Sequence, residues 1–323
     1  MARHSAPDFI EQAKASPARQ ARRTRPLAIS LVLSLRPAQW TKNLIIFAGL
    51  IFGQRLLDPG AIATSIAAFA VFCALSGVVY LVNDIADREA DRKHPLKQFR
   101  PIASGDVPVR AAAALAAILG VAALGVAFSL RLEFGVISVL YVALQGMYSG
   151  PLKHVVIIDV LTIAIGFVLR AAAGAVVIAE PVSHWLMIVT ILLALFLALS
   201  KRRHELVLLA DGATNHRPIL QEYSPYLLDQ MISVVTASTL VAYAFYTVSP
   251  ETIQKFNTDK LWLTVPFPLY GIFRYLYLVH QKEGGGSPSD MLLNDKPLLT
   301  CVLLWAVTVT LLIYGPSRVM WFS

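Results

Sequence analysis

The most charged stretch of the sequence, YLVNDIADREADRKHP at residues 80–95, begins as the end of an apolar run. If the helix of that run continues past Val82, one amide and three carboxylates share an arc of roughly 100° on one face. They are Asn83, Asp84, Asp87 and Asp91. Oxygen ligands of this kind hold Mg²⁺ together with the phosphates of a substrate. We therefore predict that these four residues bind Mg²⁺ and that the three aspartates are catalytic. The alternative is a solvated, charged helix end at a membrane surface.

A second acid–base group lies in YSGPLKHVVIIDVLTIAIGFVLRAAAGA, residues 148–175. Asp159 and Arg170 fall on one stripe of a helix, because the steps between them are four, three and four residues. At membrane depth each charge costs roughly 2.5–3.5 kcal/mol on insertion scales, so both should face a polar cavity. We predict Asp159 as a fourth catalytic carboxylate and Arg170 as a substrate-binding cation. The alternative is a structural ion pair between helices.

Basic side chains and one tyrosine accompany these carboxylates, and we predict that they bind an anionic donor. Lys201 and Arg202 belong to a third basic group, KRRHEL at residues 201–206. The other predicted donor-binding residues are Lys42, Tyr80, Lys97, Arg100, Lys153 and Arg170. For the third group, simple anchoring of a helix end at the membrane surface is the alternative.

Long apolar segments must position these side chains. Hydrophobic residues make up 56% of the 323 residues and charged residues 15%, whereas a soluble domain carries about 25% charged residues. The runs are continuous rather than alternating, which favours membrane-spanning helices over a barrel. We predict an all-α integral membrane protein with about nine transmembrane helices. The predicted spans are 44–54, 61–82, 111–130, 134–149, 155–179, 184–200, 227–248, 261–280 and 298–314.

Lysine and arginine are distributed unequally between the predicted loops. With a cytoplasmic N-terminus, 21 of the 28 lie in segments on that side and five on the other. The positive-inside rule therefore places the charged residues at the cytoplasmic face of the cell (inner) membrane, around a central polar cavity open to that side. Residues 1–28 are predicted to form a flexible basic tail before a membrane domain at 29–323. No recognition motif accompanies the net charge of +8, so we expect no nucleic-acid partner.

Together these residues resemble the UbiA-type prenyltransferase superfamily, from Arg36 to about Leu312. NDIADREAD carries that superfamily's Asn-Asp-x-x-Asp-x-x-x-Asp pattern, and RPIASG at 100–105 follows it. The resemblance implies a nine-helix fold in which two aspartate motifs hold Mg²⁺ and a diphosphate donor. Aromatic prenyltransferases of the superfamily have two aspartates four apart in the second motif. Here Asp159 is followed four residues later by Ile163, which puts a second magnesium clamp in doubt.

The finer pattern is similar to one branch of the superfamily, the decaprenyl-phosphate phosphoribosyltransferases. The segments that carry this likeness are LRPAQWTKN (35–43), YLVNDIADREADRKHPLKQFRPIASG (80–105), LKHVVIIDV (152–160) and KRRHEL (201–206). The resemblance implies transfer of a 5-phosphoribosyl group from phosphoribosyl diphosphate to a polyprenyl phosphate, with release of diphosphate, for lipid-linked arabinofuranose synthesis. Mg²⁺ is the expected cofactor, with Mn²⁺ as a substitute.

Two other functions stay open at this stage. An aromatic prenyltransferase would use a polyprenyl diphosphate and a quinone-precursor ring, and would have one diphosphate to bind. Phosphoribosyl diphosphate and a lipid phosphate bring three anionic groups, which agrees better with the surplus of lysine and arginine. A transporter would also place charges within the membrane, but the predicted acids cluster at one mouth. A homo-oligomer is compatible with the sequence, which favours no particular oligomeric state.

Overall fold

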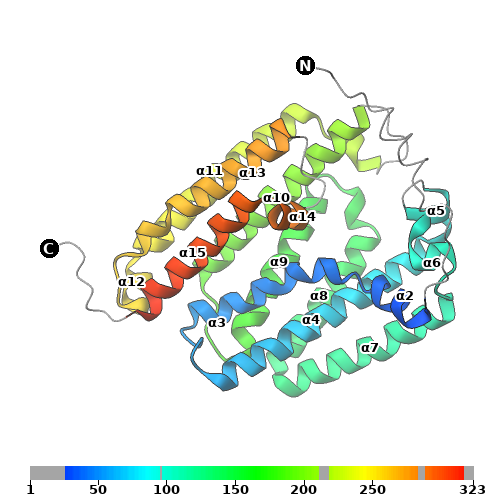
Figure 1. Cartoon of the computed structure of the whole chain (residues 1–323), viewed down its shortest axis with the longest axis horizontal. Coiled ribbons are helices and arrows are strands. Elements are labelled where there is room, and N and C mark those ends of the chain that lie inside the picture. Colours follow the sequence, from blue (N-terminus) through cyan, green and yellow to red (C-terminus); the bar gives the residue numbers. More distant parts are fainter. Residues whose placement is uncertain (1–25, 95–96, 211–217, 283–287, 316–323) are drawn as a thin grey trace.

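The computed structural model describes residues 26–94, 97–210, 218–282 and 288–315, and every element in these ranges is a helix. Figure 1 shows long helices packed side by side, as predicted for an all-α membrane protein. Seven helices are long and apolar enough to cross a membrane. They are α4 (Pro59–Ala86), α7 (Val109–Leu130), α8 (Leu132–Ser149), α9 (Ile158–Val177), α10 (His184–Ala210), α11 (Pro225–Val248) and α15 (Lys296–Tyr314). The chain therefore has the composition and helix lengths of an integral membrane protein. Most of the predicted basic tail lies outside the described residues.

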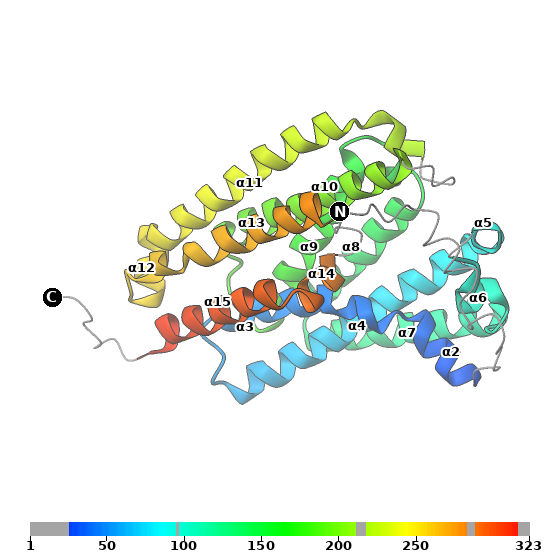
Figure 2. The same cartoon turned by 45° about the horizontal axis from the view of Figure 1, so that its top comes forward.

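Two of the nine predicted spans have a different form. The first, 44–54, comprises the end of the three-ten helix η2 (Pro37–Phe47) and the short α3 (Ala48–Phe52), and a further short helix, α2 (Leu27–Ser34), precedes them. The break between α2 and η2 has a local cause, because Arg36 adopts a left-handed backbone with φ of 53° immediately before Pro37. The eighth is α13 (Pro266–Gln281), a helix of only 16 residues. Both segments run alongside the long helices in Figures 1 and 2.

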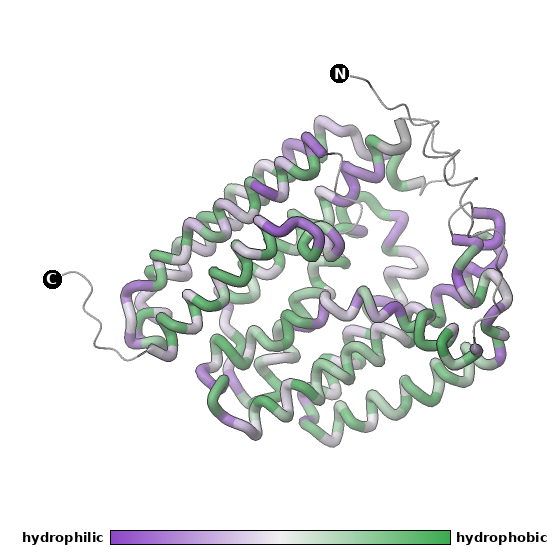
Figure 3. The backbone as a smooth tube through the Cα atoms, in the orientation of Figure 1, coloured by the Kyte–Doolittle hydropathy of each residue, from purple (hydrophilic) through white to green (hydrophobic). Residues whose placement is uncertain are grey.

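Short helices cap the two ends of the bundle. Those near the C-terminus of α4 and the N-terminus of α9 are α5 (Arg88–Lys93), η3 (Lys97–Phe99), α6 (Pro101–Ser104), η4 (Leu152–His154), η5 (Pro218–Glu222) and α14 (Pro288–Asn294). We call this the charged end. At the opposite end lie α12 (Pro250–Phe256) and η6 (Leu261–Thr264). Figure 3 shows hydrophilic stretches around α5, α6 and α14, whereas the long helices are hydrophobic along most of their length.

Local sequence signals explain where several helices begin. Asp58 caps α4 by accepting hydrogen bonds from the backbone N–H groups of Gly60 and Ala61. Ser224 and Asp295 cap α11 and α15 in the same way. In each case a proline occupies the first turn, where its missing N–H costs nothing. These caps fix the residue at which each helix begins.

Helix α9 lies against η2, α8 and α10, so it connects the two halves of the bundle. Its contact with η2 and α3 depends on two glycines. A Cβ on Gly174 would lie 2.0 Å from the carbonyl oxygen of Ile46, and one on Gly49 would lie 2.5 Å from the backbone of Gly174. No side chain fits at either position, so the backbones of η2–α3 and α9 touch directly. This close approach brings Lys42 and Asn43 to the middle of the bundle.

Candidate functional site

The first carboxylate cluster lies where α4 ends. Asp84 and Asp91 are both buried, and Arg100 donates from Nη1 to Asp84 Oδ1 at 3.1 Å and to Asp91 Oδ2 at 2.6 Å. Arg36 donates from Nη2 to the same Asp84 Oδ1 at 2.6 Å, and its guanidinium lies 4.5 Å from the ring of Tyr80. The two arginine side chains are each 29% exposed, so the cluster opens toward the surface on their side. The structure thus brings together two predicted metal ligands, Asp84 and Asp91, and two predicted donor-binding residues, Tyr80 and Arg100.

The other two predicted ligands lie beside this cluster without joining it. The helix does not run on unbroken: α4 ends at Ala86 and Asp87 forms the junction with α5. Asp87 is exposed, and Asn83 is half-buried. Neither side chain has a hydrogen-bond or ion-pair partner among the described residues. The predicted single arc is therefore divided into two carboxylates neutralised by arginine and two unengaged oxygen donors.

We tested whether these side chains suit a divalent metal. Among the described residues, no three His, Cys, Asp or Glu side chains are gathered around one point. The donor chemistry nevertheless fits Mg²⁺, because one amide and three carboxylates are hard oxygen ligands and Asp87 carries no counter-charge. Asp84 Oδ2 and Asp91 Oδ1 accept no hydrogen bond from the described residues, so each buried carboxylate keeps one oxygen for another ligand.

The second carboxylate, Asp159, is placed very differently. It lies in the first turn of α9 with no exposed surface, and Arg202 Nε donates to its Oδ2 at 2.8 Å. The hydroxyl of Tyr223 donates to Oδ1 at 2.9 Å. Burial raises the pKa of Tyr223 to about 12, so it stays protonated and keeps donating near neutral pH. Both oxygens of Asp159 are therefore occupied by partners from this chain.

Arg202 completes a closed group around Asp159. Its side chain is 1% exposed, and it also donates to Glu205 Oε2 at 2.7 Å and to the hydroxyl of Tyr148 at 3.1 Å. The group joins α8, α9, α10 and the loop that carries Tyr223. Its members saturate one another, which is the arrangement that a buried ion pair needs to be tolerated. The predicted catalytic Asp159 and donor-binding Arg202 thus bond to each other and to neighbouring side chains, and their assignment to catalysis and donor binding stays a prediction.

Arg170 does not pair with Asp159, although both are on α9. Its guanidinium donates to Asn43 Oδ1 at 2.7 Å, to the hydroxyl of Tyr141 at 2.6 Å and to the carbonyl of Gly166 at 3.0 Å. It is 7% exposed and forms no ion pair with any described residue. All of its hydrogen-bond acceptors are neutral, so a buried positive charge stays uncompensated at this point.

Lys42 lies on η2, outside the seven helices that are long enough to cross a membrane, and three other cations act on it. Burial and the charges of Lys201, Arg170 and Arg36 lower the pKa of Lys42 to about 8, while Asp290 opposes the effect. Lys201 is also 3.8 Å from Glu205, as expected for residues four apart on a helix. Arg36, Arg170 and Lys201, which lie in three other segments of the sequence, therefore act on Lys42 together.

The remaining predicted donor-binding residues lie at the surface of the charged end. Lys97 is exposed on η3, and Lys153 is half-buried on η4. The part of the chain that the structure describes gives neither ammonium group an ion-pair partner. They flank the two carboxylate regions rather than joining them, and their assignment to the donor stays a prediction.

The contributors not anticipated from the sequence include Tyr141 and Tyr148, which accept hydrogen bonds from Arg170 and Arg202. Three others are Arg36, Asn43 and Tyr223. Arg36 had one usable signal, since an arginine before proline interrupts an otherwise apolar segment. The other two had none, because an asparagine beside a lysine or a tyrosine in a loop is common on any surface. Their partners lie 127 residues away for Asn43 and 64 for Tyr223, so only the fold reveals them.

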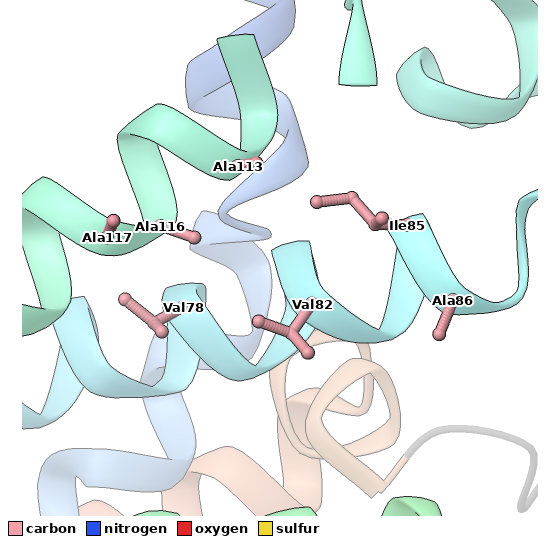
Figure 4. A pocket seen from close by; sticks show the side chains of 7 residues that line it. All are labelled: Val78, Val82, Ile85, Ala86, Ala113, Ala116 and Ala117. Atoms are coloured by element: carbon pink, nitrogen blue, oxygen red, sulfur yellow. The ribbon is translucent and has the colours of Figure 1, made fainter. Parts of the chain in front are cut away.

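An apolar groove of about 500 Å³ runs between α4 and α7. Figure 4 shows its lining side chains, which are Val78, Val82, Ile85, Ala86, Ala113, Ala116 and Ala117. Val82 lies roughly 160° around the helix from Asp84. The groove therefore opens on the face of α4 that is turned away from the carboxylate cluster, and we exclude it from the site.

Comparison with known proteins places this geometry in context. Residues 42–294 match the UbiA prenyltransferase family. The chain is 34% identical over 301 residues to the decaprenyl-phosphate phosphoribosyltransferase of Mycolicibacterium smegmatis, covering 89% of this chain and 93% of that one. It is also 34% identical to the enzyme of that name from Corynebacterium glutamicum, covering 89% and 88%. A solved UbiA homolog from Archaeoglobus fulgidus, bound to GPP and Mg²⁺, has the same fold with a TM-score of 0.66. It is 17% identical, covering 88% of this chain and 99% of that one.

Proposed function

The chain belongs to the UbiA prenyltransferase family, and from that premise we propose that it is a decaprenyl-phosphate phosphoribosyltransferase. It transfers the 5-phosphoribosyl group of phosphoribosyl diphosphate to a polyprenyl phosphate and releases diphosphate. The relatives of that name, at 34% identity over most of both chains, support this assignment. The product would serve lipid-linked arabinofuranose synthesis, as the resemblance implies.

One observation carries the choice of donor. The site has two regions that would hold anions. The carboxylates near Asn83 and Asp87 would do so through Mg²⁺, and the cations around Lys42 would do so directly. A prenyl diphosphate has a single diphosphate, which the first region suffices to hold. Phosphoribosyl diphosphate has a second, distant phosphate, and the acceptor lipid adds a third. Lysines and arginines with few acidic partners match these additional groups.

The first region would hold the metal. Asn83 and Asp87 would ligate Mg²⁺ with the second oxygens of Asp84 and Asp91, and the ion would supply Lewis-acid neutralisation of the departing diphosphate. Arg36 and Arg100 hold Asp84 and Asp91 in place by hydrogen bonds and add donors for diphosphate oxygens. Their partial exposure lets them turn from carboxylate to phosphate at little cost.

The cations around Lys42 would hold a phosphate and exclude water. Lys42 and Lys201 would bind an anionic group of donor or acceptor, in a part of the bundle where low dielectric strengthens the attraction. The acceptor phosphate is an anion near pH 7, so attack on ribose C1 needs no strong general base. The apolar walls around Arg170 and Tyr141 would protect the donor from hydrolysis.

We further propose how the chain lies in the membrane. The seven long helices, α13 and residues 44–54 would cross the bilayer, with the preceding part of η2, including Lys42, in a polar cavity at the charged end, since irregular backbone is tolerated where it faces protein or water. The charged end would face the cytoplasm, and residues 1–28 would form a basic cytoplasmic tail. In cells, single cysteines in 83–110 or 201–226 should resist an impermeant thiol reagent, with Cys73 and Cys301 replaced beforehand. Labelling of both segments from outside would reverse the orientation.

The decisive test supplies both candidate substrate pairs to purified protein with Mg²⁺. One reaction contains radiolabelled phosphoribosyl diphosphate and polyprenyl phosphate. The other contains labelled geranyl diphosphate and 4-hydroxybenzoate. Lipid-extractable label is expected in the first reaction alone. If only the second pair reacts, the protein is an aromatic prenyltransferase and the phosphoribosyl assignment is wrong.

A further inference from the structure

The most unusual charge in the bundle belongs to Arg170. It is 7% exposed, and three of its nitrogens donate to the neutral oxygens of Asn43, Tyr141 and Gly166. Its guanidinium also lies 4.6 Å from the centre of the Tyr141 ring. Buried arginines are normally paired with an acid, because an unpaired charge in the interior is costly. A cation kept here without an ion-pair partner among the described residues adds a positive potential to its surroundings.

The same hydrogen bonds hold η2 in place. Asn43 has no exposed surface, accepts from Arg170 and directs its Nδ2 to Cys73 Sγ at 3.4 Å, so it ties η2 to both α9 and α4. Tyr141 extends the network through α8 to Ser76 on α4, at 3.2 Å between hydroxyl oxygens. An 11-residue three-ten helix is longer than most and has weak internal hydrogen bonds. It therefore depends on contacts such as these to keep its shape.

Lys42 directly precedes Asn43, so the network also determines where Lys42 stands. The charges that face Lys42 come from four elements: Arg170 on α9, Lys201 on α10, Arg36 before η2 and Asp290 on α14. Three are positive and one is negative. An anion entering among them would relieve repulsion as well as gain attraction, whereas a neutral ligand would gain neither.

We propose that Arg170 is a positioning residue: its hydrogen bonds to Asn43 and Tyr141 fix η2, and its uncompensated charge prepares Lys42 to receive a phosphate of the substrate. This deepens the proposed function, on which the identity of the phosphate rests. The charge and the hydrogen bonds have separable consequences. Loss of the charge should make Lys42 more basic and less attractive to an anion, whereas loss of one hydrogen bond should not.

The test measures Lys42 directly and needs no turnover. The full-length protein in detergent is acylated at a series of pH values, and the rate of modification of Lys42 is followed by peptide mass spectrometry. The midpoint should lie near pH 8 in the wild type, and inorganic phosphate should protect Lys42. Asn43→Asp keeps an acceptor for Arg170 Nε but supplies the missing negative charge. It should move the midpoint upward by roughly one pH unit and reduce phosphate protection several-fold.

Two further variants make the outcome decisive. Tyr141→Phe removes one hydrogen bond but keeps the ring and the charge, so the midpoint should not move. Arg170→Met should move it in the same direction as Asn43→Asp. If Arg170→Met does not fold, Arg170→Gln takes its place, because it keeps amide donors for Asn43 and Tyr141 but removes the charge. A wild-type midpoint in the Arg170 variant would overturn the proposal, since the carboxylate of Asn43→Asp also acts on Lys42 by itself. Because the readout is chemical modification, failure of the phosphoribosyl assay would refute the proposed function without affecting this result.

Discussion

The two carboxylate regions at the charged end use the same residue types in opposite ways. Asp84 and Asp91 share Arg100, and Asp84 also bonds to Arg36. Both arginines are 29% exposed, and the neighbouring Asp87 is exposed and unengaged. Asp159 and Arg202 are 0% and 1% exposed, and Asp159 receives a donor at each oxygen. The first region has unused oxygens beside partly exposed cations, whereas the second has none. An aspartate at a helix end therefore keeps an oxygen for a ligand in one place and is saturated by its own chain in the other.

The exposure of the arginines explains the difference, since the aspartates of both regions are buried. At a partly exposed site the exchange of an arginine for a metal or a phosphate costs little, because water compensates the separated charges. In a dry site, removal of one partner leaves an uncompensated charge. The comparison predicts that changes in the first region affect turnover and leave the fold intact, while changes in the second affect the fold first.

The largest effect is expected at Asp87. Asp87→Ala should abolish turnover, because it removes an unengaged metal ligand, while the melting temperature stays close to that of the wild type. Chelation by EDTA should have the same effect and be reversed by Mg²⁺ or Mn²⁺. Phosphoribosyl transfer and thermal unfolding are measured on the same preparation. Full activity in chelator would show that the first region does not serve a metal.

Next in size is the loss of stability at Asp159. Asp159→Ala should lower the free energy of unfolding by roughly 3–5 kcal/mol, since it leaves Arg202 buried without its counter-ion. Thermal unfolding in detergent would measure this. The double variant Asp159→Leu with Arg202→Met should recover much of the loss. If Asp159→Ala unfolds like the wild type yet loses all activity, the second region is catalytic and the contrast drawn above is wrong.

A smaller effect is expected at Arg100, which bridges the two buried carboxylates. Arg100→Ala should raise the KM for phosphoribosyl diphosphate by about 10- to 100-fold, as expected for loss of a charge-assisted hydrogen bond. Arg92→Ala is the matched control, because Arg92 on α5 contacts only Glu89 and the carbonyl of Ala103. Equal KM values for the two variants would remove Arg100 from donor binding.

The smallest effect is a pH dependence set by Lys42, whose pKa lies at about 8. In the proposed function its charged form binds phosphate, so the KM for the phosphate-bearing substrate should be constant below pH 7 and rise as pH passes 8. The unfolded chain has the ordinary, higher lysine pKa and binds more protons between these values, so stability should increase over the same window. Opposite trends in affinity and stability would exclude unfolding as the cause. A KM that is flat to pH 9.5 would contradict the assignment of Lys42.

The sequence alone was sufficient for the class of fold, the position of most long helices and the choice of chemically active segments. Apolar runs and clusters of charge are local properties, so composition and spacing reveal them. The structure confirmed the predicted all-α architecture with helices of membrane-spanning length, and the match to the UbiA family confirmed the resemblance. Seven of the nine predicted spans correspond to helices long enough to cross a membrane. The predicted roles of individual site residues remain predictions.

Only the tertiary structure decided which aspartates are available. Asp84 meets Arg36 across 48 residues of sequence, and Asp159 meets Arg202 across 43, and no pattern within either segment distinguishes these two pairs. The outcome depends on where distant helices place their arginines and on how much water reaches each pair. The same holds for Arg170, whose partner Asn43 is 127 residues away. Partner choice and burial are properties of packing, which is why the sequence named the charged residues but the fold assigned their surroundings.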